Sequence, residues 1–159
     1  MKRVGPYLII LMLSCYALTC SAPKNIESPP ENTEQAKPFP AGDYQYVSYD
    51  QKGDKVVEGR LSITSVQTKR IQSEEQIQLK GNWQLNKAGN QERIGDQTGS
   101  GLLVGSIIQG KVYINLNPNI ADANVFLEGT IEGKRFHGMW SFKGLAGTIS
   151  QGTFEANRK

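Results

Sequence analysis

The sequence predicts an all-β domain, an eight-stranded antiparallel up-and-down β-barrel, and three observations support this fold class. Apolar and polar residues alternate with a period near two over most of residues 41–159. A glycine recurs between two apolar residues on the same strand face. Turn-forming residues separate short segments, and no stretch supports a long helix. An up-and-down barrel accommodates eight sequential strands with short connections and removes both sheet edges.

The recurring unit is apolar-x-Gly-x-apolar. Residues i, i+2 and i+4 of a strand share one face, so the glycine and its apolar neighbours all point toward the predicted core. A glycine inside a strand marks a bend or a close backbone approach, and such kinks curl a sheet into a barrel. An open, Gly-rich meander and a flat sandwich are the alternatives. The glycines are Gly59, Gly81, Gly105, Gly129, Gly138 and Gly147.

Eight strands are expected in the domain. The third is the clearest, because Ile77, Leu79, Gly81, Trp83 and Leu85 alternate with polar residues. Two connections are longer, Ser65–Glu75 and Lys87–Ser100, and the first is compatible with a helical turn. The expected strands are Asp43–Tyr49, Val56–Thr64, Gln76–Asn86, Gly101–Gln109, Val112–Asn117, Asn124–Glu132, Arg135–Phe142 and Leu145–Ala156.

One hairpin can be predicted in register. A two-residue loop at Gly133-Lys134 pairs Ile131 with Phe136, Gly129 with Gly138 and Leu127 with Trp140, and glycine in the first loop position fits a II′ turn. Lys143-Gly144 fits a I′ turn in the next connection. Ile149 and Phe154 break the alternation of the last strand, which predicts a bulge near Gln151-Gly152.

The N-terminus has the pattern of a secretory signal. Met1-Lys2-Arg3 is basic, and the apolar run Val4–Leu13 is too short for a permanent membrane span. The chain has two cysteines, Cys15 and Cys20, and both lie at the end of this run. A disulfide-stapled fold would place its cysteines among the strands, so that class is excluded.

This N-terminus resembles bacterial lipoprotein signal peptides, in which a small apolar box precedes a cysteine that is lipidated and becomes the mature N-terminus. Ala17-Leu18-Thr19 before Cys20, and Ser21 after it, carry the resemblance, although Ala17 and Thr19 depart from the preferred Leu and Gly, Ala or Ser. Cys15 is the alternative, and an ordinary cleaved signal with secretion or periplasmic release is another. The resemblance implies permanent anchoring to a membrane, since several acyl chains bind far more firmly than one. With serine after the cysteine, it implies the outer membrane.

The expected organisation is a signal peptide at residues 1–19, the lipidated cysteine and a linker at 20–40, and the barrel domain at 41–159. The linker holds five of the seven prolines among polar residues and cannot bury enough apolar surface to fold. Extended, it would reach roughly 60 Å. In the domain 14 Lys and Arg oppose 12 Asp and Glu, which excludes a nucleic-acid-binding basic patch.

The domain resembles the calycin type of barrel, which includes lipocalins, fatty-acid-binding proteins and avidins. It also resembles small bacterial lipoproteins that end in a Gly-Thr-Phe strand, as at Gly152-Thr153-Phe154. Gly81-Asn82-Trp83 is similar to the lipocalin Gly-x-Trp, but it lies in the third expected strand and not in the first. The resemblance therefore implies the architecture and assigns no ligand or binding residue.

The sequence lacks the parts of a recognisable catalytic or metal site, so no enzyme activity, cofactor or metal is expected. His137 is the only histidine, it falls on the outer face of its strand, and a zinc or acid–base site would need partners. Ser150 lacks the glycine spacing of a nucleophile elbow. Glu128 and Glu132 could pair as in a glycosidase, but they share the outward face and are better explained as solvated charge.

Two functional hypotheses follow. In the first, the barrel encloses a small apolar or amphiphilic ligand, with Trp83, Trp140, Phe136, Leu127 and Tyr46 as the lining; alternatively these residues are core. In the second, the barrel is solid and acts on another envelope protein by surface contact. The contact loop would be residues 117–124, where an exposed Ile120 lies among turn formers; alternatively the loop is capped by its own Asn and Asp side chains. The tentative contact residues are Asn117, Asn119, Ile120 and Asp122.

Overall fold

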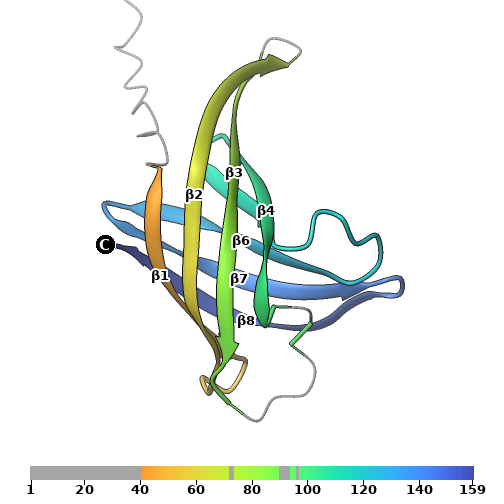
Figure 1. Ribbon diagram of the computed structural model, residues 1–159. Coiled ribbons are helices and arrows are strands. Elements are labelled where there is room, and N and C mark those ends of the chain that lie inside the picture. The colour runs from red at the N-terminus through yellow and green to blue at the C-terminus, as the bar shows by residue number, and fades with distance from the viewer. Residues whose placement is uncertain (1–40, 72–73, 90–93, 96) are drawn as a thin grey trace, which may run out of the picture. The chain divides into compact units, whose positions relative to one another are not determined.

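Eight antiparallel strands make up the computed structural model, which describes residues 41–71, 74–89, 94–95 and 97–159. No helix occurs in these residues (Figure 1). The predicted signal peptide, Cys20 and the linker lie outside the described residues. The strands are β1 (Gly42–Asp50), β2 (Lys55–Ile71), β3 (Glu74–Lys87), β4 (Gly99–Ile108), β5 (Lys111–Asn115), β6 (Asn124–Glu132), β7 (Arg135–Gly144) and β8 (Gly147–Arg158).

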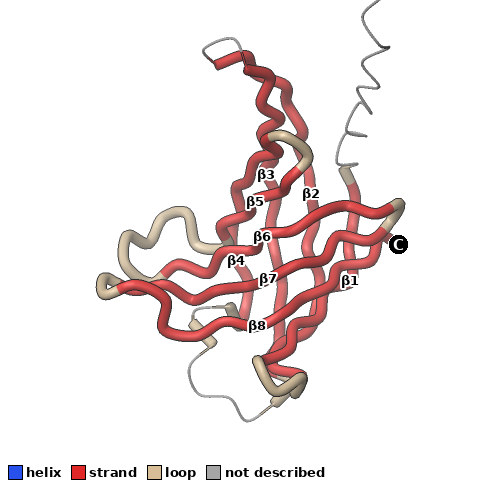
Figure 2. Tube along the Cα trace, turned by 180° about the vertical axis from the view of Figure 1, so that it is seen from behind, coloured by secondary structure: helices blue, strands red, loops and turns tan. Residues whose placement is uncertain are grey.

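The strands form a closed up-and-down barrel. Each strand pairs antiparallel with the next along the chain, and β8 returns to pair with β1, where Tyr46 lies opposite Ala156. This confirms the predicted fold class. The meander of β5 to β8 and its closure onto β1 can be followed from behind in Figure 2.

The β6–β7 hairpin has the predicted register. Gly129 lies opposite Gly138 between the pairs Leu127–Trp140 and Ile131–Phe136. A Cβ on Gly129 would lie 2.0 Å from the carbonyl oxygen of His137, and one on Gly138 would lie 2.1 Å from that of Glu128. Real Cβ atoms do not approach backbone oxygens this closely. The two strands can therefore come this close only because neither residue has a side chain.

Five of the six predicted glycines lie inside strands at close approaches of this kind, namely Gly59, Gly81, Gly105, Gly129 and Gly138. The sixth, Gly147, was assigned wrongly. It follows the β7–β8 turn with φ 108°, and a Cβ there would meet nothing within 4 Å. Gly152 plays the strand role instead, since its Cβ would lie 2.0 Å from the Tyr49 carbonyl oxygen.

Two details of the last hairpin differ from the prediction. The turn falls at Leu145-Ala146, with Gly144 opposite Gly147, and not at Lys143-Gly144. The register shift lies where Phe142 pairs with Ser150 and Lys143 with Thr148, so the extra residue is Ile149. The broken alternation was therefore read correctly as a bulge but placed too late in the strand.

In its described residues, 65–71 and 74–75, the segment expected to be compatible with a helical turn is extended strand instead. β2 and β3 continue through it as a two-stranded extension, in register from Ser65–Lys80 to Ile71–Glu74 (Figure 1). Its inward face carries Val66 and Ile77, which pack against the barrel core. Burial of these two side chains therefore favours the extended hairpin.

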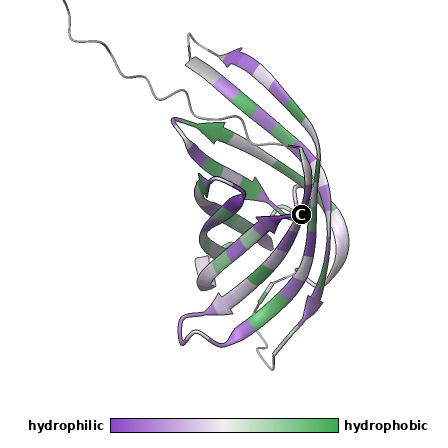
Figure 3. Ribbon diagram, turned by 90° about the vertical axis from the view of Figure 1, so that its left-hand side faces the viewer, coloured by the Kyte–Doolittle hydropathy of each residue, from purple (hydrophilic) through white to green (hydrophobic). Residues whose placement is uncertain are grey.

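The core lies inside the barrel and follows the predicted alternation, visible as alternating hydrophilic and hydrophobic residues along the strands in Figure 3. Every strand contributes to it, and β4 contributes Leu103 and Ile107. The interior members that are less than 2% exposed include Trp140, Tyr46, Phe136, Leu61, Leu79, Leu85, Leu103, Ile114, Leu116 and Leu127.

We expect Gly138→Ala to destabilise the barrel by about 1–3 kcal/mol, because the new methyl group would overlap the Glu128 carbonyl oxygen and force the two strands apart. The free energy of unfolding in urea measures this effect. The control is Met139→Ala on the same strand, whose side chain is 51% exposed and which should change stability by less than about 0.5 kcal/mol. Equal stability of Gly138→Ala and the native chain would show that the barrel does not need the close approach of β6 and β7 at this glycine.

Candidate functional site

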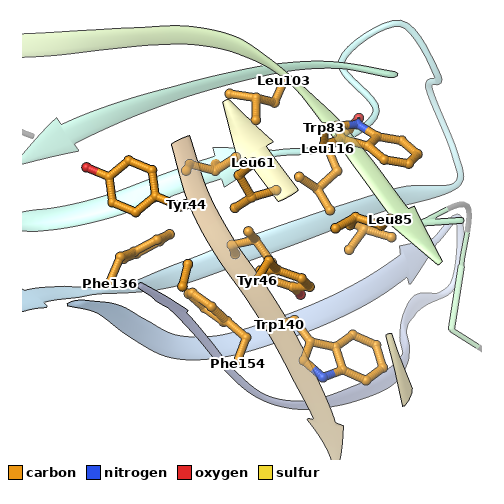
Figure 4. Close-up of a cluster of buried hydrophobic side chains, with 14 of the residues drawn as sticks. Tyr44, Tyr46, Leu61, Trp83, Leu85, Leu103, Leu116, Phe136, Trp140 and Phe154 are labelled. Carbon is orange, nitrogen blue, oxygen red and sulfur yellow. The ribbon is translucent and has the colours of Figure 1, made fainter. Parts of the chain in front are cut away.

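The five predicted lining residues all belong to the buried core inside the barrel. Figure 4 shows four of them, Trp83, Trp140, Phe136 and Tyr46. Trp83 is 4% exposed, Trp140 is 1%, and Tyr46, Leu127 and Phe136 are 0%. A side chain that borders a water-sized hollow keeps surface accessible to water, so Trp140, Tyr46, Leu127 and Phe136 line no such space inside the barrel, and Trp83 borders only a pocket at the surface. The five side chains form a close-packed core in this structure. Their role as a ligand lining stays a prediction.

The two tryptophans of this core are each held by a hydrogen bond from the indole N–H group to a backbone carbonyl oxygen. Trp83 Nε1 donates to the carbonyl oxygen of Leu116 at 2.6 Å, and Trp140 Nε1 donates to that of Tyr49 at 2.8 Å. Each bond joins segments far apart in the sequence. Buried tryptophans need such partners for their N–H groups, so both indoles are held in one orientation.

Aromatic rings fill the space between β1, β7 and β8. The Phe136 and Phe154 rings meet edge to face with centroids 4.7 Å apart, and Tyr46 stacks on Phe154 at 5.8 Å. Burial raises the pKa of Tyr46, with the Ser48 side chain acting in the opposite direction. Burial also raises the pKa of Tyr44 to about 12, partly opposed by the charge of Arg158.

A surface pocket of about 180 Å³ brings two of the predicted groups together. β3 supplies Trp83, and the loop after β5 supplies Asn117, Asn119 and Ile120. Leu102, 62% exposed, borders it from β4. The other lining residues are Thr98, Ser100, Gly101, Leu116 and Pro118. We call this the contact pocket.

The loop beside the pocket is held by its own side chains. Asn115 Oδ1 accepts a hydrogen bond from Asn117 N at 2.9 Å, and Asn124 Nδ2 donates to the Ile120 carbonyl oxygen at 2.6 Å. Ile120 was expected to be exposed, but it is partly buried because the loop folds onto the pocket. Asp122 is exposed and does not line the pocket.

The outside of the barrel carries an apolar strip that was not among the predicted sites. β4 carries apolar side chains on both faces, with Leu102, Val104 and Ile108 pointing outward, and Tyr113 on β5 continues the strip. A groove of about 460 Å³ runs beside it, lined in part by Val104, Tyr113 and Phe126. The signal was present in Leu102-Leu103-Val104 and Ile107-Ile108, since a strand that is apolar on both faces is expected to be covered on both.

The remaining candidates for chemistry lie on the outer surface. His137 Nε2 is 3.3 Å from Glu132 Oε2, and Glu128 is exposed on the same outward side. No group of three or more His, Cys, Asp or Glu side chains gathers within the described residues. Across those same residues, no helix has the length and apolar character needed to cross a membrane.

These features define an all-β protein with a closed, filled, eight-stranded antiparallel barrel, an architecture compatible with the calycin type. Comparison of the chain with protein-family models, with curated proteins and with solved structures gives no match. A function for this protein is therefore inferred from the contact pocket and from the packing of the interior.

The buried tyrosines make the stability of the barrel fall at high pH. A tyrosine has a pKa near 10 when unfolded. A raised folded-state pKa favours the neutral form, so its stabilisation is complete below about pH 10 and is lost as the pH rises toward 12. We expect Tyr46→Phe to make this loss shallower, as measured by urea unfolding between pH 8 and 12. Tyr113→Phe, on the outer face, serves as the control, and an unchanged slope in Tyr46→Phe would contradict the assignment.

Proposed function

We propose that this protein is a membrane-anchored bacterial lipoprotein whose solid barrel acts by surface contact with another protein of the cell envelope. The observation that carries the proposal is the filled interior, in which the five residues that would line a ligand cavity are at most 4% exposed. An eight-stranded barrel can be filled by side chains or can hold one small ligand. The packing supports the first arrangement, in which the exterior is the working surface.

The contact pocket is the proposed anchor point for the partner. Pockets for small molecules usually measure about 300–1,000 Å³ and enclose most of the ligand. The contact pocket, at about 180 Å³, suits one apolar side chain of a partner protein better. Interfaces are commonly centred on one such side chain in a pocket with an apolar border. Leu102 and Ile120 supply that border here.

The second part of the proposal is the anchor. Cys20 is the lipidated residue, and the linker at residues 21–40 spaces the barrel from an outer membrane. The supporting observations are the basic and apolar N-terminus, the two cysteines confined to it, and the proline-rich composition that follows. A barrel that works by contact with envelope proteins benefits from such a tether, because anchoring raises its effective concentration near them.

Photo-crosslinking in cells tests the contact pocket. A benzoylphenylalanine placed at Leu102 should give one discrete adduct with an envelope protein, and Ile120→Glu should reduce the adduct at least tenfold, because a charge would enter the apolar pocket. The same probe at Gln45, which is exposed on β1, is the control. Equal adducts from both positions would contradict the pocket. A lipid or metabolite recovered from the native protein in a one-to-one ratio would contradict the solid barrel.

Labelling with radioactive palmitate tests the anchor. We expect Cys20→Ala to abolish incorporation and to release the protein from the membrane fraction, because no other residue would then carry the acyl chains. Cys15→Ala is the matched control and should leave both unchanged. Loss of labelling only in Cys15→Ala would move the anchor to that residue, and no labelling of the native chain would favour an ordinary cleaved signal.

A further inference from the structure

The extension of the β2–β3 hairpin leaves one edge of β2 without a strand partner. β1 has 9 residues and β2 has 17, so their pairing ends where Gly42 meets Ile63. From Ser65 to Ile71, β2 pairs only with β3 among the described residues. We call this stretch the free edge (Figures 1 and 2). The strand order of the barrel is closed, so the free edge arises from the extra length of β2 and not from an open sheet.

The backbone groups along the free edge can be assigned. Ala88 N donates to the Val56 carbonyl oxygen. In this part of β2, the backbone N–H and C=O groups of the even-numbered residues therefore point toward β3. The register shift between Ile63 and Ser65 adds one residue to β2, so beyond it the odd-numbered residues direct their backbone groups toward β3. Since alternate residues of an antiparallel pair point to opposite sides, the N–H and C=O groups of Val66, Thr68 and Arg70 face away from β3.

Two prolines in the sequence before β1 oppose its continuation as a strand along the free edge. Lys159 N donates to the Asp43 carbonyl oxygen. The backbone groups of Asp43 therefore point toward β8, and those of Gly42 point toward β2. Continued backward along β2, the chain would bring Pro40 and Pro38 to the positions that face the free edge. Proline has no N–H to donate, so these positions could not pair with the carbonyl oxygens of β2.

We propose that the free edge binds an extended, acidic segment of a partner protein, which adds as a further strand beside β2. Unpaired strand edges are templates for another strand, and strand addition is a recurrent way of binding peptides. The hairpin is already ordered by the packing of Val66 and Ile77, so little ordering of the protein is required. The inference extends the proposed contact role to a second surface and does not depend on the contact pocket.

The charges around the free edge determine which occupant fits. Lys69 and Arg70 are exposed on the edge strand, and exposed Lys80 lies opposite Ser65. On β3, Glu75 is directly opposite Arg70 in the register, whereas Lys69 and Lys80 are opposite the uncharged residues Gln76 and Ser65. A second copy of the hairpin would bring two sets of cations into one junction, which like-charge repulsion disfavours. An acidic strand would meet them with complementary charge.

Residue-resolved amide hydrogen exchange, measured by NMR on the full mature chain in detergent micelles, tests the proposal. The probe is a ten-residue peptide of alternating Glu and Val. Without peptide, the amides of Val66, Thr68 and Arg70 should exchange at least tenfold faster than those of Gln67 and Lys69. Saturating peptide should remove this difference. The controls are the same peptide with every amide N-methylated and a peptide of alternating Lys and Val, and neither should protect the edge.

Two variants separate backbone pairing from charge. Thr68→Pro removes an edge N–H that makes no bond to β3, and it should weaken peptide binding at least tenfold with the barrel still folded. Lys69→Glu with Arg70→Glu keeps the backbone intact and should reverse the preference between the acidic and basic peptides. The matched control is Lys87→Glu, an exposed charge change at the other end of β3.

Several outcomes would overturn the proposal. Protection by the N-methylated peptide would show that charge alone attracts the probe, and no protection at millimolar peptide would show that the edge does not bind. Amides at Val66, Thr68 and Arg70 already protected without peptide would point to the chain's own upstream segment, or to a second copy if protection rises with protein concentration. None of these outcomes bears on the crosslink expected at Leu102, so the two proposals fail separately.

Discussion

The barrel depends on the close approach of neighbouring strands at glycines. At Gly129 and Gly138 the two backbones approach so closely that a methyl group on either residue would overlap a carbonyl oxygen. Similar contacts recur at Gly59, Gly81 and Gly105, so the sharp coiling is distributed around the sheet. A strongly coiled meander can bring its last strand back to its first, and pairing of β8 with β1 then satisfies backbone groups that would otherwise be sheet edges.

Tight curvature also explains the filled interior. Small barrels have little internal volume, and here two tryptophans and the Tyr46–Phe154–Phe136 ring cluster occupy it. The indole hydrogen bonds to Leu116 and Tyr49 fix the tryptophans against the backbone. With the interior committed to packing, the features that distinguish this barrel lie outside: the contact pocket, the apolar strip on β4 and β5, and the free edge of β2.

The free edge and the contact pocket share a physical origin. Both occur where one strand or loop extends past its neighbour, so that backbone or apolar side chains are left without cover. β2 extends past β1 at one place, and the loop after β5 lies against Trp83 of β3 at the other. Each is supported by packing against the core, through Val66 and Ile77 in the hairpin and through Leu116 in the loop. Both surfaces are therefore presented by ordered backbone.

The sequence by itself determined the all-β class, the eight strands, the β6–β7 register and most of the buried face. These follow from side-chain alternation and local turn chemistry, which act over a few residues. It placed Trp83 and Ile120 among the candidates, but it could not show that they border the same pocket. The role of Gly152, the continuation of β2 and β3 through Ser65–Glu75, and the packing of the interior were decided only by the tertiary structure. Each of these depends on contacts between strands distant in the chain, and no local pattern encodes how far one strand extends past another.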